Sequence, residues 1–286
     1  MNIKKKKRYN KHMSRTARKI KNMIDYYEFE DCCNSTIEQI TEGYENPALG
    51  LYYKNQGSDI LAVAHLDSVC KPSHFVLVQI PNKGDIVFSP VLDDRAGVYI
   101  ITKLLPSLGI NMDILLTEDE EIGASTAYFF NSSKEYKWGV EFDREHDDVV
   151  LYDYEYNNPQ WVQAIKESKF KIGIGTFSDI SYLEHLGCSF FNIGTGLVRG
   201  HSDYAHIIVD DLVYNVEKFI NFYNKYKDTK FPYSMPNYET PGHDLSWFLP
   251  KEYWHNKTTK HYRKAEPTDL PFLTLETEDD ELWKVY

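Results

Sequence analysis

Five short segments place acidic or histidine side chains directly after predicted β-strands. They are residues 65–67 (His-Leu-Asp), 93–94 (Asp-Asp), 118–121 (Glu-Asp-Glu-Glu), 153 (Asp) and 201 (His). In open α/β sheets, ligands and catalytic groups gather in the loops that follow the strands. Acidic residues in a single loop usually form only a solvated surface, but five such segments together predict a shared chemical site.

His65 and Asp67 are two positions apart, so an extended backbone places both side chains on one face. Asp67 can accept a hydrogen bond from one imidazole nitrogen of His65, which leaves the other nitrogen free to bind a metal ion. A lone histidine after a strand is otherwise commonly a hydrogen-bonded core residue. The acidic run at 119–121 contains no basic residue. Repulsion between its carboxylates favours a nearby cation or a raised pKa.

The elements that must position these residues alternate between strands and helices. Apolar runs predict strands at 60–64, 75–80, 86–88, 114–116, 149–152 and 190–193, and the second and third of these form a hairpin. Helical patterns cover 97–105, 124–130, 159–166, 178–186 and 212–223, with a weaker one at 23–44, and Asp94 and Asp210-Asp211 are expected caps. Because the strands are continuous apolar runs, we predict an α/β fold with a mostly parallel mixed sheet and helices on both faces.

Charge is distributed unevenly along the chain. Residues 1–22 contain ten Lys or Arg and no acid, whereas the remaining residues contain 22 Lys or Arg against 43 Asp or Glu. The acidic body argues against a protein built to grip nucleic-acid backbones, although residues 1–22 alone could contact nucleic acid or an acidic partner. A disordered, solvated tail is the simpler interpretation of that segment. We predict a basic arm and weak helical segment at 1–44, a catalytic domain at 45–228 and an irregular C-terminal extension at 229–286.

Other features of the sequence restrict the class of protein. A chain of 286 residues can bury a sizeable core without disulfides. Its four cysteines include no C-x-x-C pair, which favours a reducing compartment and mostly buried thiols. No apolar run is long enough for a signal peptide or a membrane span, so we expect a cytoplasmic protein without membrane contact. The sequence also lacks the G-x-S-x-G and G-x-x-x-x-G-K-[ST] motifs of serine hydrolases and P-loop proteins.

Five strings of the sequence, in order, resemble motifs of the co-catalytic di-zinc exopeptidases, the superfamily of zinc aminopeptidases and aminoacylase-like carboxypeptidases. They are 64–68 (Ala-His-Leu-Asp-Ser), 92–97 (Leu-Asp-Asp-Arg-Ala-Gly), 119–123 (Asp-Glu-Glu-Ile-Gly), 152–153 (Tyr-Asp) and 200–202 (Gly-His-Ser). Ser178-Asp179 also matches a recurrent family feature, and the resemblance covers about residues 49 to 227. Only 48 positions separate Asp153 from His201, too few for an inserted dimerisation domain. The chain is thus most similar to the single-domain aminopeptidase branch, which is compatible with a monomer.

The resemblance implies a site for two zinc ions, or for cobalt or manganese in their place. Asp93 would bridge the two ions. One ion would also be bound by His65 and Asp153, and the other by Glu121 and His201. Histidine nitrogens and carboxylate oxygens suit zinc and leave room for a water molecule.

The resemblance further implies that Glu120 is the general base and that Asp67 orients His65. Because four acids follow one another, a shift of one residue would give the role of base to Asp119. The implied activity is hydrolysis of an amide bond, most closely by an aminopeptidase acting on peptides. A deacylase or amidohydrolase acting on a small non-peptide amide would use the same metal pair. An inactive peptidase-like scaffold, recruited through the basic arm, is the alternative from another class.

Overall fold

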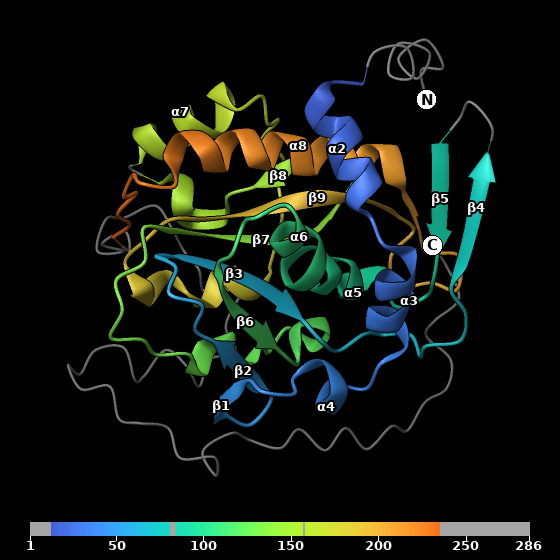
Figure 1. Cartoon of the computed structure of the whole chain (residues 1–286). Coiled ribbons are helices and arrows are strands. Elements are labelled where there is room, and N and C mark those ends of the chain that lie inside the picture. Colours follow the sequence, from blue (N-terminus) through green and yellow to red (C-terminus); the bar gives the residue numbers. More distant parts are fainter. Residues whose placement is uncertain (1–12, 81–83, 157, 235–286) are drawn as a thin grey trace, which may run out of the picture. The chain divides into compact units, whose positions relative to one another are not determined.

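A mixed β-sheet forms the centre of the computed structural model, which describes residues 13–80, 84–156 and 158–234 (Figure 1). Within these residues the sheet has ten strands in the order β1-β2-β6-β3-β7-β9-β10-β5-β4, and β8 pairs with β9. The strands are β1 (Glu45–Ala48), β2 (Leu51–Lys54), β3 (Ile60–His65), β4 (Val76–Ile80), β5 (Gly84–Phe88), β6 (Asp113–Thr117), β7 (Trp138–Glu145), β8 (Val149–Val150), β9 (Phe190–Val198) and β10 (His206–Ile208).

The four central strands β6, β3, β7 and β9 are parallel, and the pairings toward both edges are antiparallel. Every residue of β3 and of β6 is buried. Strands buried on both faces are expected to be continuous apolar runs, as Ile60 to Ala64 are. The predicted α/β fold with a mainly parallel centre is therefore confirmed, and so is the β4–β5 hairpin.

Helical segments cover both faces of the sheet. They are α2 (Arg15–Met23), α3 (Tyr26–Asn34), α4 (Ile37–Ile40), α5 (Leu92–Tyr99), η1 (Ile100–Leu104), α6 (Leu105–Ser107), η2 (Glu120–Ile122), η3 (Thr126–Phe129), η4 (Tyr152–Glu155), α7 (Pro159–Glu167), η5 (Asp179–Tyr182), η6 (Glu184–Leu186) and α8 (Val209–Tyr226). Successive side chains of a strand point to opposite faces. On β7, Trp138 contacts Phe222 of α8, whereas Glu141 accepts a hydrogen bond from Ser178 at the start of η5.

The aromatic core lies between the sheet and α8. The ring centroids of Trp138 and Phe222 are 5.0 Å apart, and Phe222 is also 5.0 Å from Phe191 of β9. Full burial of each such side chain contributes roughly 1.5–3 kcal/mol to folding. The predicted caps of α8 are wrong, because Ile208 is the N-cap residue and the acids 210–211 lie in the first turn. There their charges still favour the helix dipole.

Several elements differ from the sequence-based expectation. The segments predicted as helices at 124–130 and 178–186 are short 3-10 turns, η3 with η5 and η6. The strand predicted at 149–152 ends at Val150, because η4 begins at Tyr152. Strand β7 was not predicted at all, and it contributes more to the site than any of these.

The first described helices form part of the same compact unit as the sheet. Ala17 and Ile20 of α2 are buried, and α2 lies beside α8 (Figure 1). Phe29 of α3 stacks on Tyr99 of α5 with ring centroids 4.5 Å apart. The basic residues at 4–11 and most of the predicted C-terminal extension at 229–286 lie outside the described residues.

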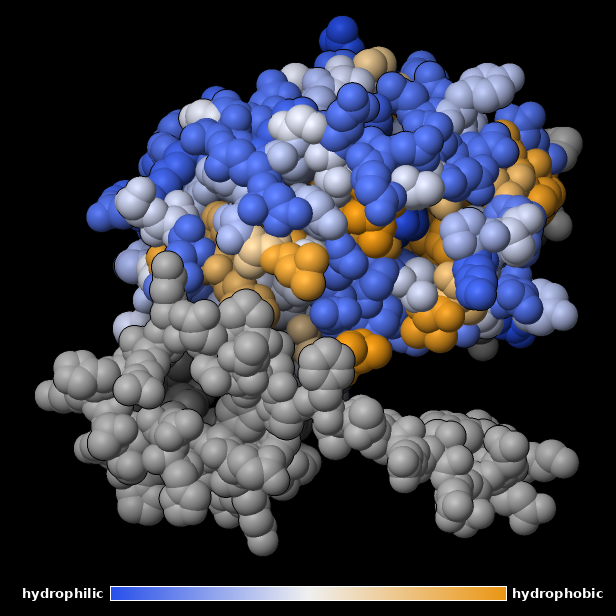
Figure 2. Space-filling view, turned by 90° about the horizontal axis from the view of Figure 1, so that it is seen from below, coloured by the Kyte–Doolittle hydropathy of each residue, from blue (hydrophilic) through white to orange (hydrophobic). Residues whose placement is uncertain are grey.

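The described helices, one face of the surface and the cysteines were each expected to be those of a protein without membrane contact. Among the described residues, no helix is both long and apolar enough to cross a bilayer. The face in Figure 2 is mainly hydrophilic, with separate groups of hydrophobic side chains. All four cysteines are free, and Cys32, Cys33 and Cys188 are buried.

Candidate metal and catalytic site

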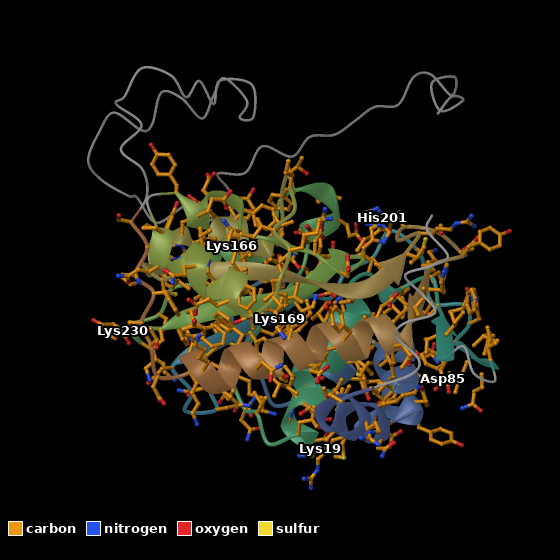
Figure 3. The ribbon with its side chains drawn as sticks, turned by 90° about the horizontal axis from the view of Figure 1, so that it is seen from above. Lys19, Asp85, Lys166, Lys169, His201 and Lys230 are labelled. Atoms are coloured by element: carbon orange, nitrogen blue, oxygen red, sulfur yellow. The ribbon has the colours of Figure 1, made fainter. Side chains whose placement is uncertain are left out.

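Most of the predicted site residues lie near the carboxyl ends of the parallel strands. His65 is the last residue of β3, Glu120 and Glu121 follow β6 in η2, Asp143 lies within β7, Asp93 is in the first turn of α5, and His201 follows β9. Figure 3 labels His201 beyond the end of β9. This edge of an open sheet is where loops from several strands converge.

A turn at the start of α5 separates the roles of its two acids. Asp93 and Asp94 both have non-helical backbone angles. The Asp94 carboxylate accepts a hydrogen bond from the backbone N–H of Gly97 at 2.9 Å, so Asp94 caps the helix as predicted. The Asp93 side chain is therefore free of the capping role and faces the two histidines.

The first half of the site surrounds the Nε2 atom of His65. This atom is 3.4 Å from Oδ1 of Asp93, 3.5 Å from Oδ1 of Asp143 and 3.9 Å from Oε2 of Glu120. The Nδ1 atom of His65 is 3.1 Å from the backbone carbonyl of Asp67, which can only accept a hydrogen bond. Nδ1 therefore carries a proton, and Nε2 is directed at the acids.

These distances fit a shared cation better than direct hydrogen bonds. The Nε2 atom of His65 is fully buried and has no hydrogen-bond partner. Separations of 3.4–3.5 Å exceed normal N–H···O lengths. Two ligands bound to one tetrahedral zinc ion at their usual bond lengths are about 3.3–3.5 Å apart. His65, Asp93 and Asp143 therefore fit the ligands of a divalent metal ion.

The acids around His65 also favour the protonated, positively charged form of its ring. Burial lowers the pKa of His65, but the carboxylates of Asp143, Asp67 and Asp93 outweigh burial and raise that pKa well above its usual value. Burial, reinforced by the charge of Asp93, raises the pKa of Asp143. A proton or a metal ion at the centre of this cluster relieves both effects.

The second half of the site surrounds the Nε2 atom of His201. This atom is 3.0 Å from Oδ2 of Asp93 and 2.9 Å from Oε2 of Glu121. Asp93 thus directs one carboxylate oxygen to each histidine, which is the geometry of a bridging ligand. The hydrogen bond between His201 and Asp93 raises the pKa of His201 to about 9. The second oxygen of Glu121, Oε1, is buried without a hydrogen-bond partner.

Asp67 links the two halves through its backbone and side chain. Its carbonyl accepts from His65 Nδ1, and its carboxylate Oδ1 is 3.4 Å from the same nitrogen. Its other carboxylate oxygen accepts a hydrogen bond from the backbone N–H of Glu121 at 3.2 Å. Asp67 therefore contacts the ring of His65, with the carbonyl as the nearer partner, and its carboxylate also contacts η2.

The structure distinguishes between the two candidate bases. Glu120 is largely buried and its carboxylate faces His65, whereas Asp119 is exposed and has a left-handed backbone with φ 66°. Burial raises the pKa of Glu120 to about 7, close to the value at which a carboxylate exchanges protons at neutral pH. The geometry therefore favours Glu120 over Asp119.

Asp153 is not part of this cluster, and its predicted place is taken by Asp143. Asp153 is exposed in η4, whereas the side chain of Asp143 on β7 is only 11% exposed and lies beside His65. Asp153 follows the apolar run 149–152 in the sequence, but the strand that reaches the site is β7. We therefore replace Asp153 by Asp143 in the candidate ligand set.

A buried polar layer behind the site was also missed. The backbone N–H of Asp143 donates to Asn192 Oδ1 at 3.0 Å, and the Asn192 amide donates to Ser178 Oγ at 3.3 Å. Ser178 donates to Glu141, and Ser125 donates to Asp179 next to it. Burial raises the pKa of both Glu141 and Asp179. The motif Ser178-Asp179 thus lies behind the site rather than in it.

Comparison with known proteins supports the fold. No family model matches the sequence, and no curated protein matches it. The aminopeptidase PepT of Bacillus cereus ATCC 10987 is 11% identical, with 72% of this chain and 97% of that chain covered and a TM-score of 0.51. A tripeptidase of Staphylococcus aureus subsp. aureus Mu50 is 11% identical, with 73% and 99% covered and a TM-score of 0.52. The chain shares its fold with these two peptidases, which confirms the fold that the motifs implied.

Proposed function

We propose that this protein is a metal-dependent hydrolase that cleaves amide bonds, most closely an aminopeptidase acting on peptides. The observation that carries the proposal is the position of Asp93, which directs one oxygen to His65 and the other to His201. Each histidine has a further carboxylate beside it, Asp143 or Glu121. The fold shared with an aminopeptidase and a tripeptidase supports the same reaction class.

The donor atoms divide into two sets that share Asp93. His65, Asp93 and Asp143 would hold one ion, and Asp93, Glu121 and His201 the other. One imidazole nitrogen with carboxylate oxygens in each set suits zinc, and also cobalt or manganese. When bound, such a pair of ions lowers the pKa of a water molecule and polarises the scissile carbonyl.

Glu120 is the proposed proton carrier. Its carboxylate faces the cluster from η2 and, with a pKa of about 7, is partly deprotonated at neutral pH. Oε2 of Glu120 accepts the proton of the attacking water as the new C–O bond forms. The same oxygen then donates that proton to the leaving amine nitrogen as the C–N bond breaks. Asp67 keeps the His65 ring oriented throughout, through its contact with Nδ1.

The test measures metal content and substrate class on the same protein. The full chain is stripped with a chelator, reloaded with zinc, cobalt or manganese, and analysed for bound metal by mass spectrometry. Each form is then assayed with aminoacyl p-nitroanilides, with di- and tripeptides, and with N-acyl amino acids. We expect release of N-terminal residues that is lost on chelation and restored by reloading.

Each alternative gives a different result in this test. Cleavage restricted to the N-acyl compounds would identify a deacylase and contradict the aminopeptidase assignment. A protein that takes up none of the three metals would be an inactive scaffold. The Asp153→Asn variant is a matched control, because this carboxylate lies outside the candidate ligand set.

A further inference from the structure

Helix α2 is anchored to the body by one of its faces. Ala17 and Ile20 are buried, and Ser14 caps the helix by accepting from the backbone N–H of Ala17 at 2.9 Å. Lys21 pairs with Asp210 of α8, with Nζ 2.8 Å from Oδ1. The second half of the basic N-terminal segment is therefore a docked helix rather than a solvated tail.

The opposite face of α2 carries cations without acidic partners. Arg15, Arg18 and Lys19 are exposed and are spaced by three and four positions, so they lie on one side of the helix. We call these three residues the basic stripe. No carboxylate in the described part of the chain forms an ion pair with any of them. Figure 3 shows Lys19 at the outer edge of the molecule.

We propose that the basic stripe binds the phosphate backbone of a nucleic acid. Three cations held on a fixed helix face form a row that complements a row of phosphates, and their binding would release condensed counterions. The sequence directly before the helix adds six Lys or Arg at positions 4–11 and no acid. The rest of the chain has an excess of acids and would repel a polyanion, so binding would be confined to this end.

The packing of α2 argues for a nucleic acid over other anionic partners. A helix that binds a membrane surface inserts an apolar face, but the apolar face of α2, Ala17 and Ile20, is buried in the protein. Protein interfaces have an apolar or aromatic centre, whereas the basic stripe consists only of charged side chains. A polyanion bound through its backbone needs no such apolar contact.

The basic stripe and the candidate site lie at opposite edges of the view in Figure 3, where Lys19 and His201 are labelled. A nucleic acid on the stripe would therefore leave the site open. The role of the basic stripe would be to hold the protein near a nucleic acid, independently of the reaction catalysed. This inference does not depend on the proposed function.

Binding is measured by fluorescence anisotropy with a labelled 20-nucleotide single-stranded RNA, the same DNA sequence, and its duplex. The full chain is compared with the variant Arg15→Gln/Arg18→Gln/Lys19→Gln. The matched control is Lys166→Gln/Lys169→Gln/Lys171→Gln, which removes the same charge from exposed positions on and after α7. Polyglutamate competition and phosphatidylserine vesicles test the other anionic partners. Thermal unfolding checks that all variants are folded.

We expect the stripe variant to bind at least tenfold more weakly near 0.1 M salt, while the control changes less than twofold. The slope of log K against log salt should fall by roughly 2 to 3 for the stripe variant, and by about 1 for Arg18→Gln alone. Equal weakening in the stripe and control variants, or unchanged binding by the stripe variant, would overturn the proposal. Stronger binding to vesicles or polyglutamate than to the oligonucleotides would also overturn it.

Discussion

Two regions of the molecule bury carboxylates, and they treat the charge in opposite ways. Asp113 begins β6 with a fully buried side chain. Its two oxygens accept five hydrogen bonds, from Lys134 Nζ at 2.7 Å, Tyr53 at 2.7 Å, Tyr136 at 3.1 Å and the backbone N–H groups of Gln56 at 2.9 Å and Ser58 at 3.0 Å. The charge of Asp113 is therefore satisfied entirely by the protein.

The site around Asp93 lacks such donors. Five carboxylates converge there, and the basic groups that pair with them within 4 Å in the described residues are the imidazoles of His65 and His201. Buried atoms such as His65 Nε2 and Glu121 Oε1 have no hydrogen-bond partner. Unsatisfied buried polar atoms cost about 1–3 kcal/mol each, so they persist where a ligand completes them.

The pKa values of the acids in the two regions also differ, because that of Asp113 is lowered and that of Glu120 is raised. Burial raises the pKa of Asp113, but Lys134, Tyr53 and the two backbone donors outweigh it, and the net pKa is lowered. Burial raises the pKa of Glu120 to about 7, although the charge of His65 opposes the effect of burial. A buried acid with its own donors is a structural element, whereas the acids around Asp93, which lack lysine and tyrosine donors among the described residues, form the proposed site for an external cation.

The largest expected effect concerns Glu120. The Glu120→Gln variant keeps the shape of the side chain but cannot accept a proton, so turnover should fall by roughly 10²- to 10⁴-fold. Its metal content should remain that of the wild type, because Glu120 is not in the candidate ligand set. Steady-state kinetics and metal analysis on one preparation measure both. Asp119→Asn is the control, and a larger loss in that variant would transfer the role of base to Asp119.

The next largest effect tests whether Asp143, rather than Asp153, binds the metal ion. Asp143→Asn should weaken metal binding at least tenfold, because loss of a ligand costs no less than loss of a residue that only orients one. Asp153→Asn should bind metal as the wild type does. The readout is the rise in melting temperature on adding zinc, since a ligand at 100 times its Kd stabilises a protein by about 2.7 kcal/mol. A lost zinc response in Asp153→Asn, with a normal one in Asp143→Asn, would reverse our assignment.

Asp143 and Asp153 also show which part of the site could not be predicted from the sequence. β3 and β6 were predicted because residues 60–64 and 114–116 are continuous apolar runs, and His65 and the acids at 118–121 come shortly after those runs. β7 was missed because Glu141 and Asp143 interrupt its apolar pattern. Both acids are withdrawn from solvent, Glu141 fully and Asp143 largely, because the site and the layer behind it contain their partners. A local apolar pattern cannot reveal a strand whose polar residues are satisfied by distant segments.

The 3-10 turns were missed for a related reason. Predicted helices at 124–130 and 178–186 rest on short apolar patterns, but side-chain hydrogen bonds such as that between Ser125 and Asp179 hold these segments in tight turns. By contrast, α8 has buried residues over many turns, and its apolar period predicted it although the expected caps were wrong. Long periodic elements were therefore predictable, whereas the turns that shape the site depend on tertiary contacts.

A third prediction tests whether Asp113 is structural. Lys134→Met removes the strongest donor to a fully buried carboxylate and should reduce the free energy of unfolding by about 1.5–3 kcal/mol, the usual value of a hydrogen bond to a charged group. The control is Lys230→Met, which breaks an ion pair with the exposed Glu135 and should lower the free energy of unfolding much less, because solvent screens exposed pairs. Urea unfolding of both variants measures the difference. Equal losses would mean that burial adds nothing to the Asp113 cluster.

The smallest expected effect is the pH dependence of the free energy of unfolding that is lost in Lys134→Met. Because the folded pKa of Asp113 lies below its ordinary value of 3.8, the unfolded chain binds more protons in acid. The stabilisation from Lys134 is therefore fully present above about pH 4–5 and is lost as the pH falls through the folded pKa. The free-energy difference between wild type and Lys134→Met, measured in urea from pH 6 to pH 3, should shrink toward acid. A difference that stays constant over this range would show that Lys134 acts by packing against its neighbours and not by neutralising Asp113.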